Sequence, residues 1–132
     1  MTTDIANLST GELVDYQPVS PMELELIIRE LGDRLESAVP VLKVMWHERY
    51  EAERDMISAR AKAMLSSKAA TVTEKRAEAD LAALPYRLTF DLKKETLHAA
   101  EELQKALTAK LYGYLNLNKV QSAAYNAGGF AR

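Results

Sequence analysis

The chain has 132 residues, of which 48% are hydrophobic and 27% charged, and its formal net charge is −2. This length predicts one domain, and the slight acidic balance argues against a dedicated nucleic-acid binder, which usually carries a basic excess. The absence of cysteine excludes disulfide bonds, thiolate metal ligands and cysteine nucleophiles. No stretch approaches the roughly 18 uninterrupted apolar residues of a membrane span, and the N-terminus lacks the pattern of a signal peptide. We therefore expect a cytoplasmic protein without a membrane partner.

Residues 1–19 show weak helical periodicity and contain interrupting glycine and proline, so we expect a flexible N-terminal arm. The first strong helix signal is SPME at 20–23. Ser20 suits the N-cap, Pro21 suits the first helical position, and Glu23 stands where a capping-box carboxylate reaches back. Apolar residues then recur at helical spacing, at Leu24, Ile27, Ile28, Leu31 and Leu35.

Pro40 decides how the next stretch is divided. Proline disfavours α geometry at the residue before it, so the sequence favours one helix that ends before Pro40 and a second helix over 41–66. A single helix over 21–66, kinked at Pro40, is the alternative. The apolar and alanine positions after the proline form one broad stripe with a period near 3.6 residues, through Leu42, Met45, Trp46, Tyr50, Met56, Ile57, Ala63 and Met64.

A second break separates two further helices. Serines at the end of the preceding stripe favour a loop, after which Thr71 with Glu74, or Thr73 alone, can cap a new helix. This helix is expected to be short and to cover residues 74–84, because Pro85 interrupts it.

The last helix is expected to begin between residues 86 and 90 and to end between 123 and 126. Its apolar seam is continued by amide side chains at the same heptad positions. Amides on a seam cost stability but can determine register or oligomeric state, whereas Asn118 and Gln121 could also lie at a solvated helix end. The predicted seam consists of Phe90, Leu97, Ala100, Gln104, Leu107, Leu111, Tyr114, Asn118 and Gln121.

These elements predict an all-α protein without strands. Long amphipathic helices need a partner face, so the economical arrangement is a long antiparallel helical hairpin, with the short helix at its turn and an additional N-terminal helix alongside. Residues 20–126 would form the helical domain and 127–132 a flexible C-terminal tail, with Gly128 and Gly129 as a hinge. A hairpin this long and thinly apolar hides its own stripe poorly, which predicts self-association.

Catalytic machinery is not indicated. His47 and His98 are far apart, and neither has a second histidine four residues away, so we expect surface histidines and no metal site. The chain has no phosphate loop, no dinucleotide fingerprint and no nucleophile elbow. The sequence therefore predicts a protein that is not an enzyme, with no catalytic residue and no cofactor.

Four residues of the helices are candidate contacts to a partner or to a second copy. Trp46 and Tyr50 stand four residues apart on one helix face, and such side chains occur as interface anchors or, more often, in a core. Tyr114 and Gln121 belong to the predicted seam of the last helix and are candidates on that ground.

The C-terminal region supplies four more candidates. Phe130 and Arg132 would form a short contact tail beyond the last helix, and simple fraying is the alternative. Lys110 and Lys119 lie near tyrosines and are candidate nucleic-acid contacts, because bases can stack on aromatic rings beside cations. A continuous stacking platform is not expected on a single helix, so direct binding of nucleic acid is not favoured.

Several features occur together between Trp46 and Arg132. A long charged helix ends in ARAKAMLSS at 59–67, TVTEKRAEA at 71–79 restarts the helical pattern, and a Gln-Ser step in the final helix precedes a tail ending in Phe-Ala-Arg. In these features the segment resembles small helical proteins that tailed bacteriophages encode among their recombination and replication genes. The chain departs from that pattern at its two C-terminal glycines and in the segment before Trp46, so the tail conformation and the N-terminal helix stand outside the resemblance.

The resemblance implies a phage accessory role near DNA recombination or replication in the host-cell cytoplasm, and it implies no catalytic residue. The leading hypothesis is therefore a non-enzymatic helical protein that acts through protein–protein contacts and self-association. Its expected partners are other copies of itself and either a phage recombinase or a host protein. Two alternatives stay open: an inhibitor or adaptor that binds a host defence protein, and a structural or assembly protein of the phage particle.

Overall fold

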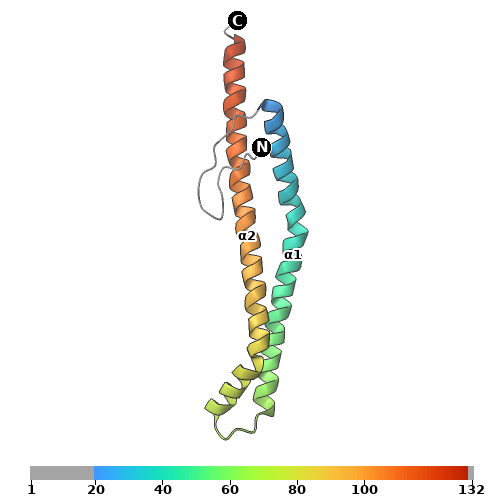
Figure 1. Cartoon of the computed structure of the whole chain (residues 1–132), viewed down its shortest axis with the longest axis vertical. Coiled ribbons are helices and arrows are strands. Elements are labelled where there is room, and N and C mark those ends of the chain that lie inside the picture. Colours follow the sequence, from blue (N-terminus) through green and yellow to red (C-terminus); the bar gives the residue numbers. More distant parts are fainter. Residues whose placement is uncertain (1–19, 131–132) are drawn as a thin grey trace. The chain divides into compact units, whose positions relative to one another are not determined.

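The structure is a computed structural model that describes residues 20–130, with side chains over residues 20–126. In this part the chain is all-α and has no strand: helix α1 spans Pro21–Ser66 and helix α2 spans Val72–Phe130 (Figure 1). The two helices pack against each other and run antiparallel, joined by residues 67–71, so the predicted helical hairpin is confirmed. The predicted arm of residues 1–19 lies outside the described residues.

Both helices begin at the caps that the sequence predicts. At the start of α1 the Glu23 backbone N–H donates to Ser20 Oγ at 3.1 Å, and the Ser20 N–H donates to Glu23 Oε2 at 3.4 Å. These two bonds complete a capping box, which satisfies backbone donors that have no partner within the helix. At the start of α2 the Glu74 N–H donates to Thr71 Oγ1 at 3.1 Å, so Thr71 is the N-cap.

The favoured division of the first stretch at Pro40 is wrong, because α1 continues unbroken from Pro21 to Ser66 with Pro40 inside it. The single-helix alternative is the one observed, and no separate N-terminal helix is present in the described residues. Pro40 has no N–H, so the Glu36 carbonyl four residues earlier lacks its helical donor. Both residues are exposed, and water can satisfy that carbonyl.

The prediction of a separate short helix at the turn is also wrong. Helix α2 runs continuously from Val72 and contains Pro85. Figure 1 shows the first turns of α2, drawn in yellow-green, running in a different direction from the rest of the helix. This bend agrees with the clash that a proline ring makes with the carbonyl four residues earlier. Pro85 therefore lies inside a helix that changes direction and does not end one.

The C-terminal end of α2 lies beyond its predicted position. The helix reaches Phe130, whereas the sequence predicted an end between residues 123 and 126. Gly128 and Gly129, predicted as a hinge, are helical in this structure. The side chain of Phe130 and all of Arg132 lie outside the described part of the chain, so the predicted contact tail stays a prediction.

The packing divides the chain into two units, Met1–Gly32 with Lys110–Arg132 and Asp33–Ala109. In the first unit the buried side chains are Leu24, Leu31 and Tyr114. In the second unit they are Ala52, Ala79, Ala83, Leu97 and Leu107. The alanines lie toward the turn, where small side chains let two helices approach closely, and the leucines lie farther along α2.

The predicted seam of α2 is confirmed at all but one position. Leu97, Leu107 and Tyr114 are buried, and the other members are half-buried with the exception of Asn118, which is exposed. Gln121 is half-buried and therefore belongs to the packed seam. Asn118 is exposed, as expected for a residue at a solvated helix end. An amide at a seam position is therefore present at Gln104 and Gln121.

The predicted stripe of α1 is wrong at two positions. Tyr50 and Ile57 are 47% and 56% exposed, while the other predicted members are half-buried. The packed positions of α1 advance in alternating steps of four and three residues, which is the seven-residue repeat of helices that coil around each other. Tyr50 and Ile57 each follow a packed residue, Arg49 and Met56, by one position. One position turns a side chain by about 100°, which takes it out of the seam.

Two ion pairs show the register of the helices in the second unit. Arg60 Nε lies 2.8 Å from Asp80 Oδ1, and Lys93 Nζ lies 2.9 Å from Glu48 Oε2. In both pairs the residue numbers add up to about 140, so residues related in this way lie opposite each other. Their side chains are 39–65% exposed, and exposed pairs stabilise by less than about 1 kcal/mol. We infer that they select the register more than they stabilise the fold.

Candidate protein-contact site

Five of the exposed leucines of α2 share one face and form a regular apolar row among the described residues. Leu81 is 72% exposed, Leu84 45%, Leu88 62%, Leu92 60% and Leu103 43%. They follow one another at steps of three, four, four and eleven residues, which puts them on one face of the helix. We call these five residues the leucine ladder. Since the buried seam lies on another face, α2 has two apolar faces.

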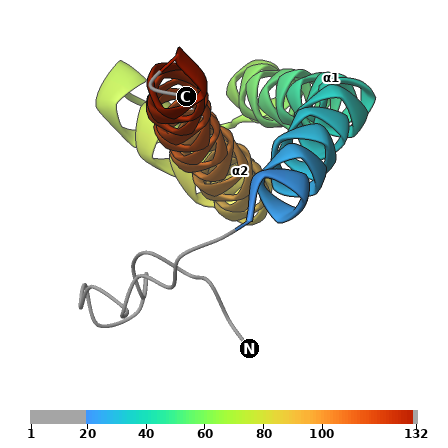
Figure 2. The ribbon, with the colours of Figure 1, turned by 90° about the horizontal axis from the view of Figure 1, so that it is seen from above.

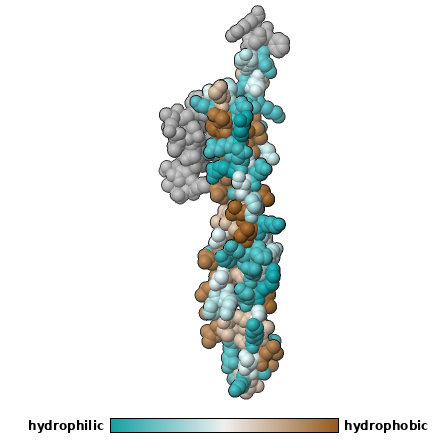
Figure 3. All heavy atoms as spheres, turned by 90° about the vertical axis from the view of Figure 1, so that its right-hand side faces the viewer, coloured by the Kyte–Doolittle hydropathy of each residue, from teal (hydrophilic) through white to brown (hydrophobic). Residues whose placement is uncertain are grey.

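No other described element covers the ladder. Figure 2 shows α1 and α2 from above, and no third helix lies beside them in the described residues. On α1 the exposed apolar residues are more scattered, and Figure 3, viewed from the α1 side, shows brown side chains separated by teal ones. Single apolar residues at a surface are ordinary, whereas a regular row is not.

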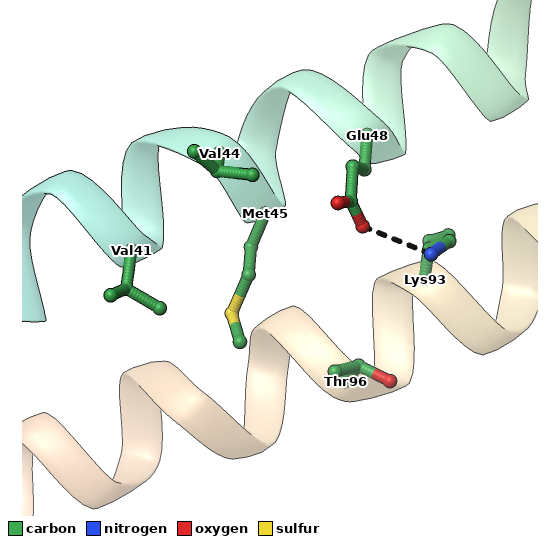
Figure 4. A pocket seen from close by; sticks show the side chains of 6 residues that line it. All are labelled: Val41, Val44, Met45, Glu48, Lys93 and Thr96. Carbon is green, nitrogen blue, oxygen red and sulfur yellow. Dashed lines mark hydrogen bonds and ion pairs between the residues drawn. The ribbon is translucent and has the colours of Figure 1, made fainter.

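An open groove of about 320 Å³ lies beside the ladder, between the two helices of the second unit. Figure 4 shows Met45 pointing from α1 toward α2, with Val41 and Val44 near it. Thr96 lines the groove from α2, and the Glu48–Lys93 ion pair closes one end. The lining offers apolar contact and one pair of charges that already neutralise each other. It therefore suits an apolar side chain better than a charged ligand.

The aromatic pair predicted on α1 is present, but it lies near the surface. The ring centroids of Trp46 and Tyr50 are 5.6 Å apart and their planes are tilted by 31°. Arg49 Cζ lies 5.0 Å from the Trp46 ring centroid, a cation–π distance. Trp46 is half-buried and Tyr50 is exposed, so the pair does not belong to the buried core.

The C-terminal candidates do not gather at one place. Tyr114 is only 2% exposed, so it is a core residue of its own chain and offers no surface to a partner. Gln121 is half-buried and lines a hollow of about 410 Å³ in the first unit, together with Pro21 and residues of α2. Lys110 and Lys119 are nine residues apart, which puts them on opposite sides of an α-helix. The two lysines therefore form no basic stripe.

Both histidines are at the surface, as the sequence predicts. His47 Nε2 lies 3.0 Å from Glu51 Oε1, one turn farther along α1, and His98 is exposed on α2. Among the described residues no group of three or more His, Cys, Asp or Glu side chains is placed to hold a metal ion. No helix in the described part is long and apolar enough to span a membrane.

Comparison of the chain with protein-family models, with curated proteins and with solved structures finds no match. The contact surfaces are therefore assigned from their own geometry. The ladder and the groove were not predicted from the sequence. The signal that could have revealed the ladder is the recurrence of leucine at 81, 92 and 103, which is independent of the seven-residue seam.

A buried polar atom of the seam of α2, on Gln104, leads to a prediction about stability. Oε1 of Gln104 is buried, and no donor among the described residues reaches it. The register of the ion pairs places Gln104 level with Glu36 and Ser37 on α1, and neither side chain donates a hydrogen bond to it. A buried acceptor without a partner costs about 1–3 kcal/mol.

We expect Gln104→Leu to raise the free energy of unfolding by about 1–3 kcal/mol, because leucine fills a similar volume without burying an unpaired acceptor. Urea unfolding followed by circular dichroism measures the change. Asn118→Leu, at an exposed amide position on the same helix, is the comparison variant and should change the free energy by less than about 0.5 kcal/mol. A loss of stability in Gln104→Leu would show that the amide is hydrogen-bonded in solution.

Proposed function

We propose that this chain is a non-enzymatic helical protein that works through protein–protein contacts, the first of which is self-association. The observation that supports the proposal is the leucine ladder, an ordered apolar face on a helix whose other apolar face is already packed. Leaving such a row in water is unfavourable, and soluble proteins rarely expose a contiguous apolar patch of more than a few hundred Å² unless it binds something.

The groove beside the ladder supports the same proposal. Val41 and Val44 are 53% and 55% exposed, and they extend the apolar surface from α2 onto α1. The only charges in its lining are Glu48 and Lys93, which are paired at 2.9 Å. A protein partner that covered the groove would thus bury no unpaired charge, which is the usual large penalty at an interface.

The setting that we propose is DNA recombination or replication of a bacteriophage, with a phage recombinase or a host protein as a further partner. This setting is supported by the resemblance of the segment from Trp46 to Arg132. An inhibitor of a host defence protein and a component of the phage particle are the competing proposals. Binding through protein contacts, without direct contact to nucleic acid, distinguishes the accessory role from a DNA-binding role.

We expect full-length protein at micromolar concentration to elute with a mass of at least twice the 14.7 kDa of the chain, by size-exclusion chromatography with light scattering. We expect this association because it removes the leucine ladder from water. A mass of 14.7 kDa at every concentration tested up to about 100 µM would contradict self-association.

In a gel-shift experiment with single-stranded DNA the protein alone should give no shifted band, and a salt-sensitive shift would favour direct binding instead.

A further inference from the structure

We propose that the leucine ladder packs against the same ladder of a second copy of this chain, with the two α2 helices antiparallel and the two-fold axis at Leu92. This inference rests on the self-association proposed above, and it adds the face, the orientation and the register. The groove then lies at the edge of the contact.

The spacing of the ladder makes it match itself when reversed. Leu81, Leu92 and Leu103 are eleven residues apart, about three helical turns, so they recur on one side of α2 at intervals of about 16.5 Å along the helix, with the bend at Pro85 between Leu81 and Leu92. A two-fold contact uses the same patch on both subunits, so the patch must be complementary to itself. In an antiparallel pair centred on Leu92, Leu81 of each copy meets Leu103 of the other, and the two Leu92 side chains meet each other.

The burial of the row sets the limits of the contact. Exposure falls from 72% at Leu81 to 60% at Leu92 and 43% at Leu103, and the next position of the row, Tyr114, is 2% exposed. Successive seam positions are seven residues apart and shift slightly in one sense around α2, whereas successive row positions are eleven residues apart and shift slightly in the other sense. The seam and the row therefore converge along the helix. The row is therefore free for a partner only between Leu81 and Leu103, and Leu92 is the midpoint of that stretch.

The exposed area is sufficient for a dimer. The exposed fractions of the five ladder leucines amount to nearly three fully exposed leucines, or on the order of 500 Å² in each copy. Two copies together bring on the order of 1,000 Å² of leucine surface, which is about the size that separates a specific interface from a chance contact. Neighbouring small side chains such as Ala99 and Ala106 add to this area and let the helices come close.

Near the two-fold axis, the side of α2 that borders the groove carries no unpaired charge. Leu88 and Thr96 are each four residues from Leu92, so Leu88 of one copy meets Thr96 of the other, at the wall of the groove. Lys93, which follows Leu92 on this side, is held by Glu48 at 2.9 Å. The second copy can therefore extend over the edge of the groove without burying an unpaired ammonium group.

Cysteine cross-linking tests the orientation directly, because the chain has no cysteine of its own. In the proposed dimer Leu92→Cys forms a disulfide-linked dimer under mild oxidation. Leu81→Cys and Leu103→Cys do not cross-link separately, but an equal mixture of the two gives a linked heterodimer. Cross-linking of all three single variants would indicate a parallel pair and overturn the proposed orientation. Linking of Leu65→Cys, an 89% exposed position off the ladder, to the same extent as Leu92→Cys would indicate random collisions and overturn the proposal as well.

Charge substitution tests the face by a second measurement. Leu92→Glu places two carboxylates at the two-fold axis, so we expect dimer affinity to fall at least about tenfold with helicity unchanged. Leu65→Glu is the matched control and should dimerise like the unmodified chain. If the unmodified chain dimerises and Leu92→Glu does so equally well, the ladder is the wrong face while self-association stands. If the unmodified chain is a monomer, both proposals fail.

Discussion

Replacing Leu97 with alanine is expected to lower the free energy of unfolding by about 2–5 kcal/mol. Leu97 is 1% exposed and lies in the second unit, where α2 packs against α1. Its truncation removes buried methyl groups and leaves a cavity that neighbouring side chains can fill only in part. A two-helix layer can collapse around a cavity more readily than a larger core, which favours the lower half of this range.

Urea unfolding followed by circular dichroism at one fixed protein concentration measures the effect, because self-association would otherwise add to the apparent stability. Leu65→Ala is the matched control, since Leu65 is 89% exposed and the same side-chain atoms are removed without creating a cavity. We expect the control to change the free energy by less than about 0.5 kcal/mol. Equal effects of the two substitutions would show that α1 and α2 do not pack through Leu97 in solution.

Replacing Pro40 with alanine is expected to raise the free energy of unfolding by about 2–3 kcal/mol. Proline in a helix interior is about 3 kcal/mol less favourable than alanine, and part of this is returned because proline also restricts the unfolded chain. Pro40 is exposed and inside α1, so alanine restores the N–H donor to the Glu36 carbonyl without meeting a neighbour. The gain requires that the helix continues through residue 40.

Pro21→Ala is the control for this second experiment. Pro21 is the first residue of α1, where the backbone N–H has no partner within the helix and proline has no cost, so we expect almost no change in stability. Thermal unfolding of both variants, at the same concentration, gives the comparison. If Pro40→Ala does not stabilise the protein, residues 21–66 behave in solution as two helices that end and begin at Pro40.

Sequence signals predicted a structural feature correctly where that feature is determined by contacts between residues close together in the chain. The Ser20–Glu23 capping box and the Thr71 cap involve residues three positions apart, and both form as predicted. The two prolines were misjudged for the opposite reason. At Pro40 and Pro85 the local preference is to end a helix, but the residues on both sides belong to faces that pack against the other helix. The free energy of burying those faces exceeds the cost of one missing hydrogen bond.

The sequence by itself determined that this chain is helical, that Ser20 and Thr71 cap its helices, and which residues of α2 from Phe90 onward form most of the packed seam, because propensity, capping and the seven-residue repeat are properties of neighbouring residues. Only the tertiary structure decided which apolar residues remain in water. Tyr50 and Ile57 on α1, and Leu92 with its ladder on α2, have the same hydrophobicity as many buried side chains. A helix with two apolar rows can bury either one against its neighbour, and the row left exposed is known only when the neighbour is in place.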